Sequence, residues 1–112
     1  MQQKKKRTKT EPELLRQIES VGASSDSIQA VFSLDLPLKK LLDPNVVEET
    51  TNQVLRRAEK ELGHKPKGVS VFKNLGSFAV SADASFIRKI IDDPDIASAV
   101  ASNQPDQDVK PR

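Results

Sequence analysis

The sequence contains no cysteine and only one histidine among its 112 residues. Without cysteine the chain forms no disulfide and no cysteine-built zinc site, and it has no thiol chemistry. His64 alone does not supply a metal-ligand set. It also gives no basis for a Ser-His-Asp triad on a core of this size. We therefore expect a non-enzymatic protein with no catalytic residue, no metal and no cofactor.

Long hydrophobic runs are also missing. No apolar stretch approaches the roughly 20 residues that a transmembrane helix needs. The N-terminal "MQQKKKRTKT" is charged, and no apolar segment follows it as it would in a secretory signal. With neither a signal nor disulfides, we expect a cytoplasmic protein that does not contact a membrane.

Positive charge is concentrated at the N-terminus. The net charge is +2, yet five positive charges lie within residues 1–10, so the rest of the chain is net acidic. The basic run could bind phosphate backbones, or it could be a solvated tail. Its residues are Lys4, Lys5, Lys6 and Arg7. RNA-binding domains stack bases on strand aromatics, and this chain has no cluster of aromatic and basic residues. Nucleic-acid binding is therefore the less favoured reading.

Residues 1–26 read as a basic tail followed by one short helix. Residues 1–10 are too polar to pack, so we expect them to be disordered. The pattern predicts a helix from Pro12 to Val21 with one apolar face, and Gly22 as its end. A helix of this length depends on packing for its stability. It is therefore either docked on the domain or waiting for a partner.

Residues 27–103 read as one domain with the order strand, helix, strand, strand, helix, strand. A strand over 27–36 alternates apolar and polar residues, and a helix begins after the Asp43-Pro44 cap and ends at Gly63. A hairpin follows over 69–80, with Asn74 and Gly76 as turn residues. A second helix begins after Asp83, ends before Pro94 and leads into the last strand. In that strand we expect Ile96, Ser98 and Val100 on one face and the alanines on the other.

This order predicts an α+β, ferredoxin-like βαββαβ fold. We expect a four-stranded antiparallel sheet with two helices on one face, plus the short N-terminal helix. The first and third strands should lie side by side in the centre. Residues 104–112 read as a flexible, polar C-terminal tail.

The stretch "FKNLGSFAVSADASFIRKIIDDPDIASAV" resembles the propeptides of subtilisin-like serine proteases and the stand-alone inhibitors that share their fold. The shared features are the Phe72-Lys73 pair, a short turn, a strand rich in small residues, a helix, and the Asp93-Pro94-Asp95-Ile96 joint. The resemblance covers residues 27–103. It implies a protein-binding module, acting as a protease inhibitor or a folding chaperone, with a subtilisin-like serine protease as partner.

In that family the open face of the sheet lies on two protease helices, and the last strand leads a tail into the active-site cleft. Acidic residues late in that strand cap the two helices. The matching positions here, Val100 to Ser102, are not acidic, and the nearest acids are Asp106 and Asp108. The tail also lacks an apolar end.

The partner surface predicted on this basis lies near the last strand and its exit. An edge strand of alanine and serine is either a flat surface for a partner or a strand that lies close under a helix. The candidate contact residues are Phe72, Ala97, Ala99, Ala101, Asn103 and Gln104. A regulatory or assembly domain that binds a non-protease partner through the sheet face or the edge strand is the alternative, and nucleic-acid binding through the basic tail is the second alternative.

Overall fold

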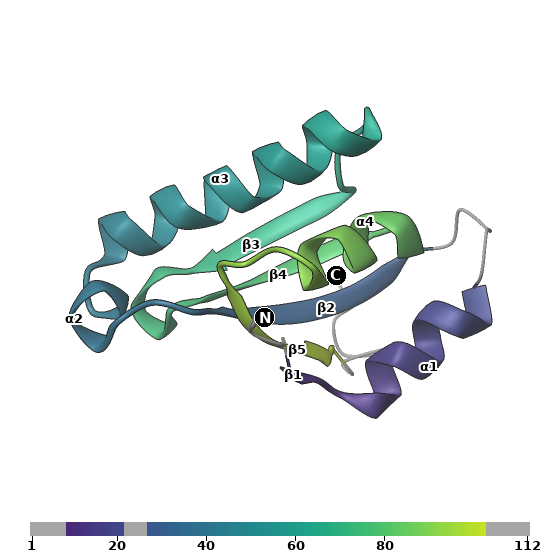
Figure 1. Ribbon diagram of the computed structural model, residues 1–112, viewed down its shortest axis with the longest axis horizontal. Coiled ribbons are helices and arrows are strands. Elements are labelled where there is room, and N and C mark those ends of the chain that lie inside the picture. Colours follow the sequence, from purple (N-terminus) through teal and green to yellow (C-terminus); the bar gives the residue numbers. More distant parts are fainter. Residues whose placement is uncertain (1–8, 22–26, 103–112) are drawn as a thin grey trace, which may run out of the picture.

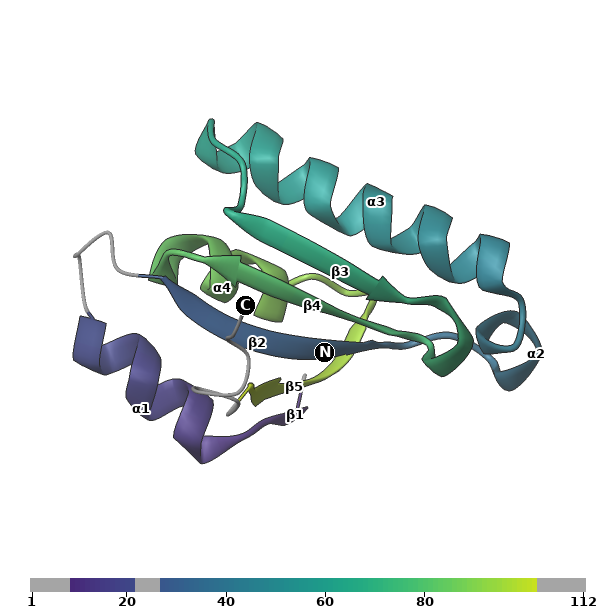
Figure 2. The same cartoon turned by 180° about the vertical axis from the view of Figure 1, so that it is seen from behind.

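The computed structural model describes residues 9–21 and 27–102, which form one sheet with helices against one of its faces (Figure 1). The strands are β1 (Lys9–Thr10), β2 (Ile28–Leu34), β3 (Gly68–Phe72), β4 (Ser77–Ala82) and β5 (Ile96–Ala101). The helices are α1 (Pro12–Val21), α2 (Leu38–Leu41), α3 (Pro44–Leu62) and α4 (Ala84–Ile91), with a short 3₁₀ turn η1 (Lys73–Leu75). Seen from behind, the strands lie in front of α4 (Figure 2).

The sheet is five-stranded and mixed, with the order β1-β5-β2-β4-β3. The α+β class is confirmed, and β2 and β4 are neighbours as predicted. The prediction of four antiparallel strands is wrong in one respect. Strands β2 to β5 pair antiparallel, but β1 adds to the outer edge of β5 in parallel.

Strand β1 overturns the expectation of disorder for Lys9 and Thr10. These residues pair with Ser98 and Ala99. The next residue, Glu11, donates its backbone N–H to the carbonyl of Ala99 over 2.9 Å. Pairing with the edge of β5 satisfies the backbone hydrogen-bonding groups of these residues. Their polar composition gives no sign of this pairing.

The helix and turn signals act as the sequence predicts. The carboxylate of Asp43 accepts a hydrogen bond from the N–H of Asn45, and α3 ends at Gly63 with φ +79°. The carboxylate of Asp83 accepts from the N–H of Phe86 at the start of α4. In the β3–β4 turn, only Gly76 takes a positive φ, +64°, and Asn74 lies within the 3₁₀ turn.

One core lies between the sheet and helices α1, α3 and α4. Its largest fully buried side chains include Phe32, Phe78 and Phe86. Leu14 and Ile18 of α1 belong to the same buried cluster. Helix α1 is therefore docked on the domain, which was one of the two alternatives left open by the sequence.

A β-bulge sets the faces of β5. Ser33 pairs with Ser98, but Leu34 pairs with Ile96, so Ala97 is an extra residue on the β5 side. A bulge reverses the alternation of side chains along the strand. Ile96 therefore points into the core together with Ala99, while Val100 is exposed. The predicted placement of Ile96, Ser98 and Val100 on one face is wrong for this reason.

Candidate protein-binding surface

The face of the sheet turned away from the helices carries small, uncharged side chains. We call it the open face and define it by the strand residues that alternate with the core positions. They are Gln29, Val31 and Ser33 of β2, Ser70 and Phe72 of β3, Ser77, Ala79 and Ser81 of β4, and Ser98 and Val100 of β5. Among the described strand residues on this face, only Lys9 at the β1 edge is charged.

The paired residues at the centre of the open face are small. Val31 lies opposite Ala79 on one side and Val100 on the other, and Ser33 lies opposite Ser77 and Ser98. Directly opposed side chains share a face of the sheet. Short side chains in such pairs leave the backbone close to the surface. These short side chains therefore leave room for the backbone of another protein to approach the sheet closely over β2, β4 and β5.

The structure separates the predicted contact residues into different places. Phe72 lies on the open face in β3 and is 39 % exposed. Ala97 is partly buried at the bulge. Ala99 and Ala101 face the core and are buried, which matches the reading of a strand that lies close under helices. Asn103, Gln104 and the basic residues Lys4, Lys5, Lys6 and Arg7 lie outside the described residues.

Two residues of this surface were not found from the sequence. Val100 is 41 % exposed on the open face because the bulge turns it outward. Glu11 brings a carboxylate to the end of β5, where its Oε1 accepts the N–H of Ala101 over 2.8 Å. Neither had a sequence signal, because a bulge and a contact across 90 residues leave no local pattern.

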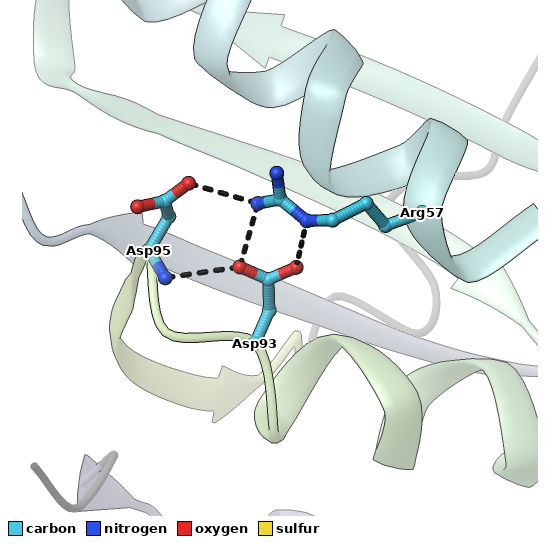
Figure 3. Close-up of polar contacts among 3 residues, drawn as sticks. All are labelled: Arg57, Asp93 and Asp95. Atoms are coloured by element: carbon cyan, nitrogen blue, oxygen red, sulfur yellow. Dashed lines mark hydrogen bonds and ion pairs between the residues drawn. The ribbon is translucent and has the colours of Figure 1, made fainter. Parts of the chain in front are cut away.

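The Asp-Pro joint before β5 is held by an arginine from α3 (Figure 3). Arg57 donates from Nε and Nη2 to the two oxygens of Asp93, both over 2.9 Å, and from Nη2 to Asp95 over 2.8 Å. Asp93 also accepts the backbone N–H of Asp95 over 2.9 Å. The N–H of Asp35 donates to the carbonyl of Asp95, which ties the joint to the end of β2.

The arginine stays charged in this setting. The hydrogen bond to Asp93 is the main cause that raises the pKa of Arg57, with that to Asp95 adding to it and partial burial acting in the opposite direction. The side chain of Asp93 is only 8 % exposed, whereas Arg57 and Asp95 are more open. Two of the three aspartates around Pro94, Asp93 and Asp95, therefore bind the arginine as part of the turn into β5.

A hollow of about 540 Å³ lies beside this joint, between α3 and α4. Its lining carries both signs of charge. The residues are Arg57, Ala58, Lys60, Glu61, Lys89, Asp92, Asp93 and Pro94. Within the described ranges, no group of three or more histidine and acidic residues is arranged to hold a metal ion.

The single histidine makes local contacts. His64 Nε2 lies 3.1 Å from Asp83 Oδ2, and its Nδ1 lies 3.3 Å from the carbonyl of Leu62. Its ring packs against Phe86 with centroids 5.8 Å apart. His64 therefore lies at the carbonyl end of α3, and its ring also contacts the start of α4.

A second group of exposed apolar side chains lies on α2 and the adjoining turn. Leu38, Leu42 and Leu75 are largely exposed, and the exposed residues Lys39, Lys40 and Lys73 lie near them in the sequence. This end of the molecule therefore differs in chemistry from the uncharged open face.

Comparison of the chain with protein-family models, with curated proteins and with solved structures finds no match. Within the part of the chain that the structure describes, no helix combines the length and the apolar character needed to cross a bilayer.

Proposed function

We propose that this chain is a non-enzymatic protein-binding module that contacts its partner through the open face. The observation that carries the proposal is the chemistry of that face. Over β2 to β5 its described residues are serine, alanine, valine, glutamine and one phenylalanine. A partner that covers these residues takes no charged side chain out of water. Removing charge from water is a large cost in forming an interface. Val100, Val31 and Ala79 lie side by side on this face, and adjoining apolar side chains at a surface favour an interaction site.

For the partner we propose a subtilisin-like serine protease, with this chain acting as an inhibitor or folding chaperone of the propeptide type. The order of β2 to β5 with α3 and α4 supports a ferredoxin-like βαββαβ domain. The resemblance around the Asp93-Pro94 joint implies that such a domain sets its open face on protease helices. The N–H of Ser102 donates to the carbonyl of Gln29, so the last described residue is paired with β2, which contributes to that face.

The carboxylate of Glu11 lies close to the positions late in the last strand where the resemblance implies acidic residues. Positions 100–102 have none, but Glu11 reaches Ala101 from the β1–α1 junction. One of its oxygens accepts a backbone N–H, so any charge interaction with a helix end would be shared with that bond. We expect weaker binding to a typical subtilisin than two dedicated acidic caps would give.

The test is inhibition of a panel of subtilisin-like proteases by the full chain and by a chain that ends at Ser102. Ala79→Arg places a charge in the centre of the open face, and Gln53→Arg adds the same charge at an exposed position of α3. We expect slow-binding inhibition that is lost on truncation, weakened at least tenfold by Ala79→Arg and unchanged by Gln53→Arg. Digestion of the chain without inhibition at high micromolar concentration would rule out the protease as partner.

The same variants separate the alternatives. A regulatory or assembly domain that uses the open face on a non-protease partner would show sensitivity to Ala79→Arg without protease inhibition. Nucleic-acid binding through Lys4 to Arg7 would show a steep salt dependence that disappears when the basic residues are removed. That deletion should end at residue 8, because Lys9 and Thr10 are part of the sheet.

A further inference from the structure

The outer edge of β5 is a binding site for a strand followed by a helix, and the chain fills it with its own residues. Lys9 and Thr10 pair with Ser98 and Ala99. Glu11 extends this short pairing with two bonds. Its N–H donates to Ala99 O over 2.9 Å, and its carboxylate accepts from Ala101 N over 2.8 Å, where a strand would place a carbonyl.

An apolar seat continues the site beyond the strand edge. Leu14 and Ile18 are fully buried in the core cluster, and they follow Glu11 by three and seven residues. That spacing puts both side chains on one face of α1. Leu15 points away and is half-exposed. The site therefore selects two extended residues, then a carboxylate, then apolar residues at these two spacings.

The segment is attached by few polar contacts. The carboxylate of Glu13 accepts hydrogen bonds from Arg16 and Gln17, all within α1. Among the described residues, the β1 ladder and the two bonds of Glu11 are the polar contacts that tie residues 9–21 to the sheet. Exchange of the segment has to break these contacts and uncover Leu14 and Ile18, and docking on an identical chain would restore all of them.

We propose that residues 9–21 exchange between two copies of this chain, so that the segment of one copy docks on the β5 edge of the other. The second copy is the occupant because it carries the same strand, the same Glu11 and the same Leu14 and Ile18. Every contact observed within one chain can then form between two chains without any change in chemistry, as in domain swapping. The inference does not depend on the proposed protease partner.

The absence of cysteine makes a disulfide trap specific. Lys9 and Ser98 are register partners on the same side of the sheet. Paired strands lie close enough for a disulfide between such positions. A chain with Lys9→Cys is mixed with a separate chain carrying Ser98→Cys in a glutathione redox buffer. In the control mixture Ser70→Cys replaces Ser98→Cys, because Ser70 is exposed on β3, at the opposite edge of the sheet.

We expect the Lys9→Cys and Ser98→Cys chains to give at least ten times more heterodimer than the control mixture. A single chain with both substitutions should close its disulfide internally and stay monomeric. Adding Leu14→Asp to the Lys9→Cys chain should lower the heterodimer yield, whereas Leu15→Asp should not. If the Leu14→Asp chain does not fold, Glu11→Ala takes its place. Equal yields in the two mixtures, once the double variant has closed completely, would overturn the proposal.

Discussion

The two faces of the sheet use the same strands but carry side chains of very different size. On the helix side, Phe32 and Phe78 lie opposite each other in β2 and β4, with their rings stacked at a centroid distance of 5.3 Å. One residue earlier in β2 and one later in β4, Val31 and Ala79 form the matching pair on the open face. Alternation along each strand makes this division possible. The comparison shows where stability is concentrated and where it is not.

The helix side is complete without a partner, because its large residues are buried by α1, α3 and α4. On the open face, Val31, Ala79 and Ser98 are small and only partly buried, so they add less to the core than the large residues of the helix side. This is the face that we propose for partner binding. Substitutions on the two faces should therefore separate stability from partner binding.

The largest expected difference lies between two phenylalanines on neighbouring strands. Phe78→Ala removes a fully buried ring and should lower the free energy of unfolding by about 3–5 kcal/mol. Phe72→Ala, on the open face, should lower it by about 1 kcal/mol or less. Urea unfolding followed by far-UV circular dichroism measures both, since the chain has no tryptophan for fluorescence. Similar losses for the two variants would contradict the division into two faces.

The bulge in β5 gives the next comparison. Ile96 is buried and Val100 is exposed, although an unbroken strand would place both on one face. Ile96→Ala should cost about 2–4 kcal/mol as a core truncation, and Val100→Ala should cost about 0.5 kcal/mol or less. A loss below about 1 kcal/mol for Ile96→Ala would show that the residue is not in the core.

Much of the fold could be predicted because its signals are local. The Asp43 and Asp83 caps, the glycine at position 63 and the alternation in β2 each act over a few residues, and the structure contains all of them. Their order was sufficient to place β2 beside β4. The α+β class follows from signals of this kind.

The features that failed depend on contacts between distant parts of the chain. The bulge at Ala97 is set by pairing with β2, and strand β1 exists because β5 offers it an edge. Arg57 reads as an exposed helix residue until the joint is folded against it. The candidate surface was therefore only partly predicted: Phe72, named as a candidate contact residue, lies on the open face, while Val100 and Glu11 needed the three-dimensional structure.

A smaller effect is expected at the joint that leads into β5. Arg57→Ala leaves the largely buried Asp93 carboxylate without its arginine, and we expect a loss of about 1–2 kcal/mol, reduced by the exposure of Arg57. Arg56→Ala, at the neighbouring exposed position, is the control and should have little effect. Chemical denaturation of the two variants provides the measurement. Equal stabilities would argue against a stabilising contact of Arg57 with Asp93 and Asp95.

The titration of Arg57 should not make the stability loss of Arg57→Ala depend on pH. A base with a raised pKa in the folded protein contributes stability below its unfolded pKa and loses it only above the folded value. Because the pKa of Arg57 is raised from an already high value, that loss lies beyond the working range. As far as the titration of Arg57 is concerned, the difference in free energy of unfolding between Arg57→Ala and the wild type should stay constant between about pH 6 and 9.

The smallest predicted effect has the opposite sign and lies on the helix side of the sheet. Thr51 of α3 is fully buried, and its Oγ1 has no hydrogen-bond partner within the described residues. A buried hydroxyl without a partner lowers stability, and valine has the same shape without the hydroxyl. Both residues are β-branched, so helix propensity changes little. Thr51→Val should therefore raise the free energy of unfolding by about 1 kcal/mol, whereas Thr50→Val, at a partly exposed position, should change it little. Destabilisation by Thr51→Val would mean that the hydroxyl has a bonding partner in solution, and the helix side would then be less apolar than its packing indicates.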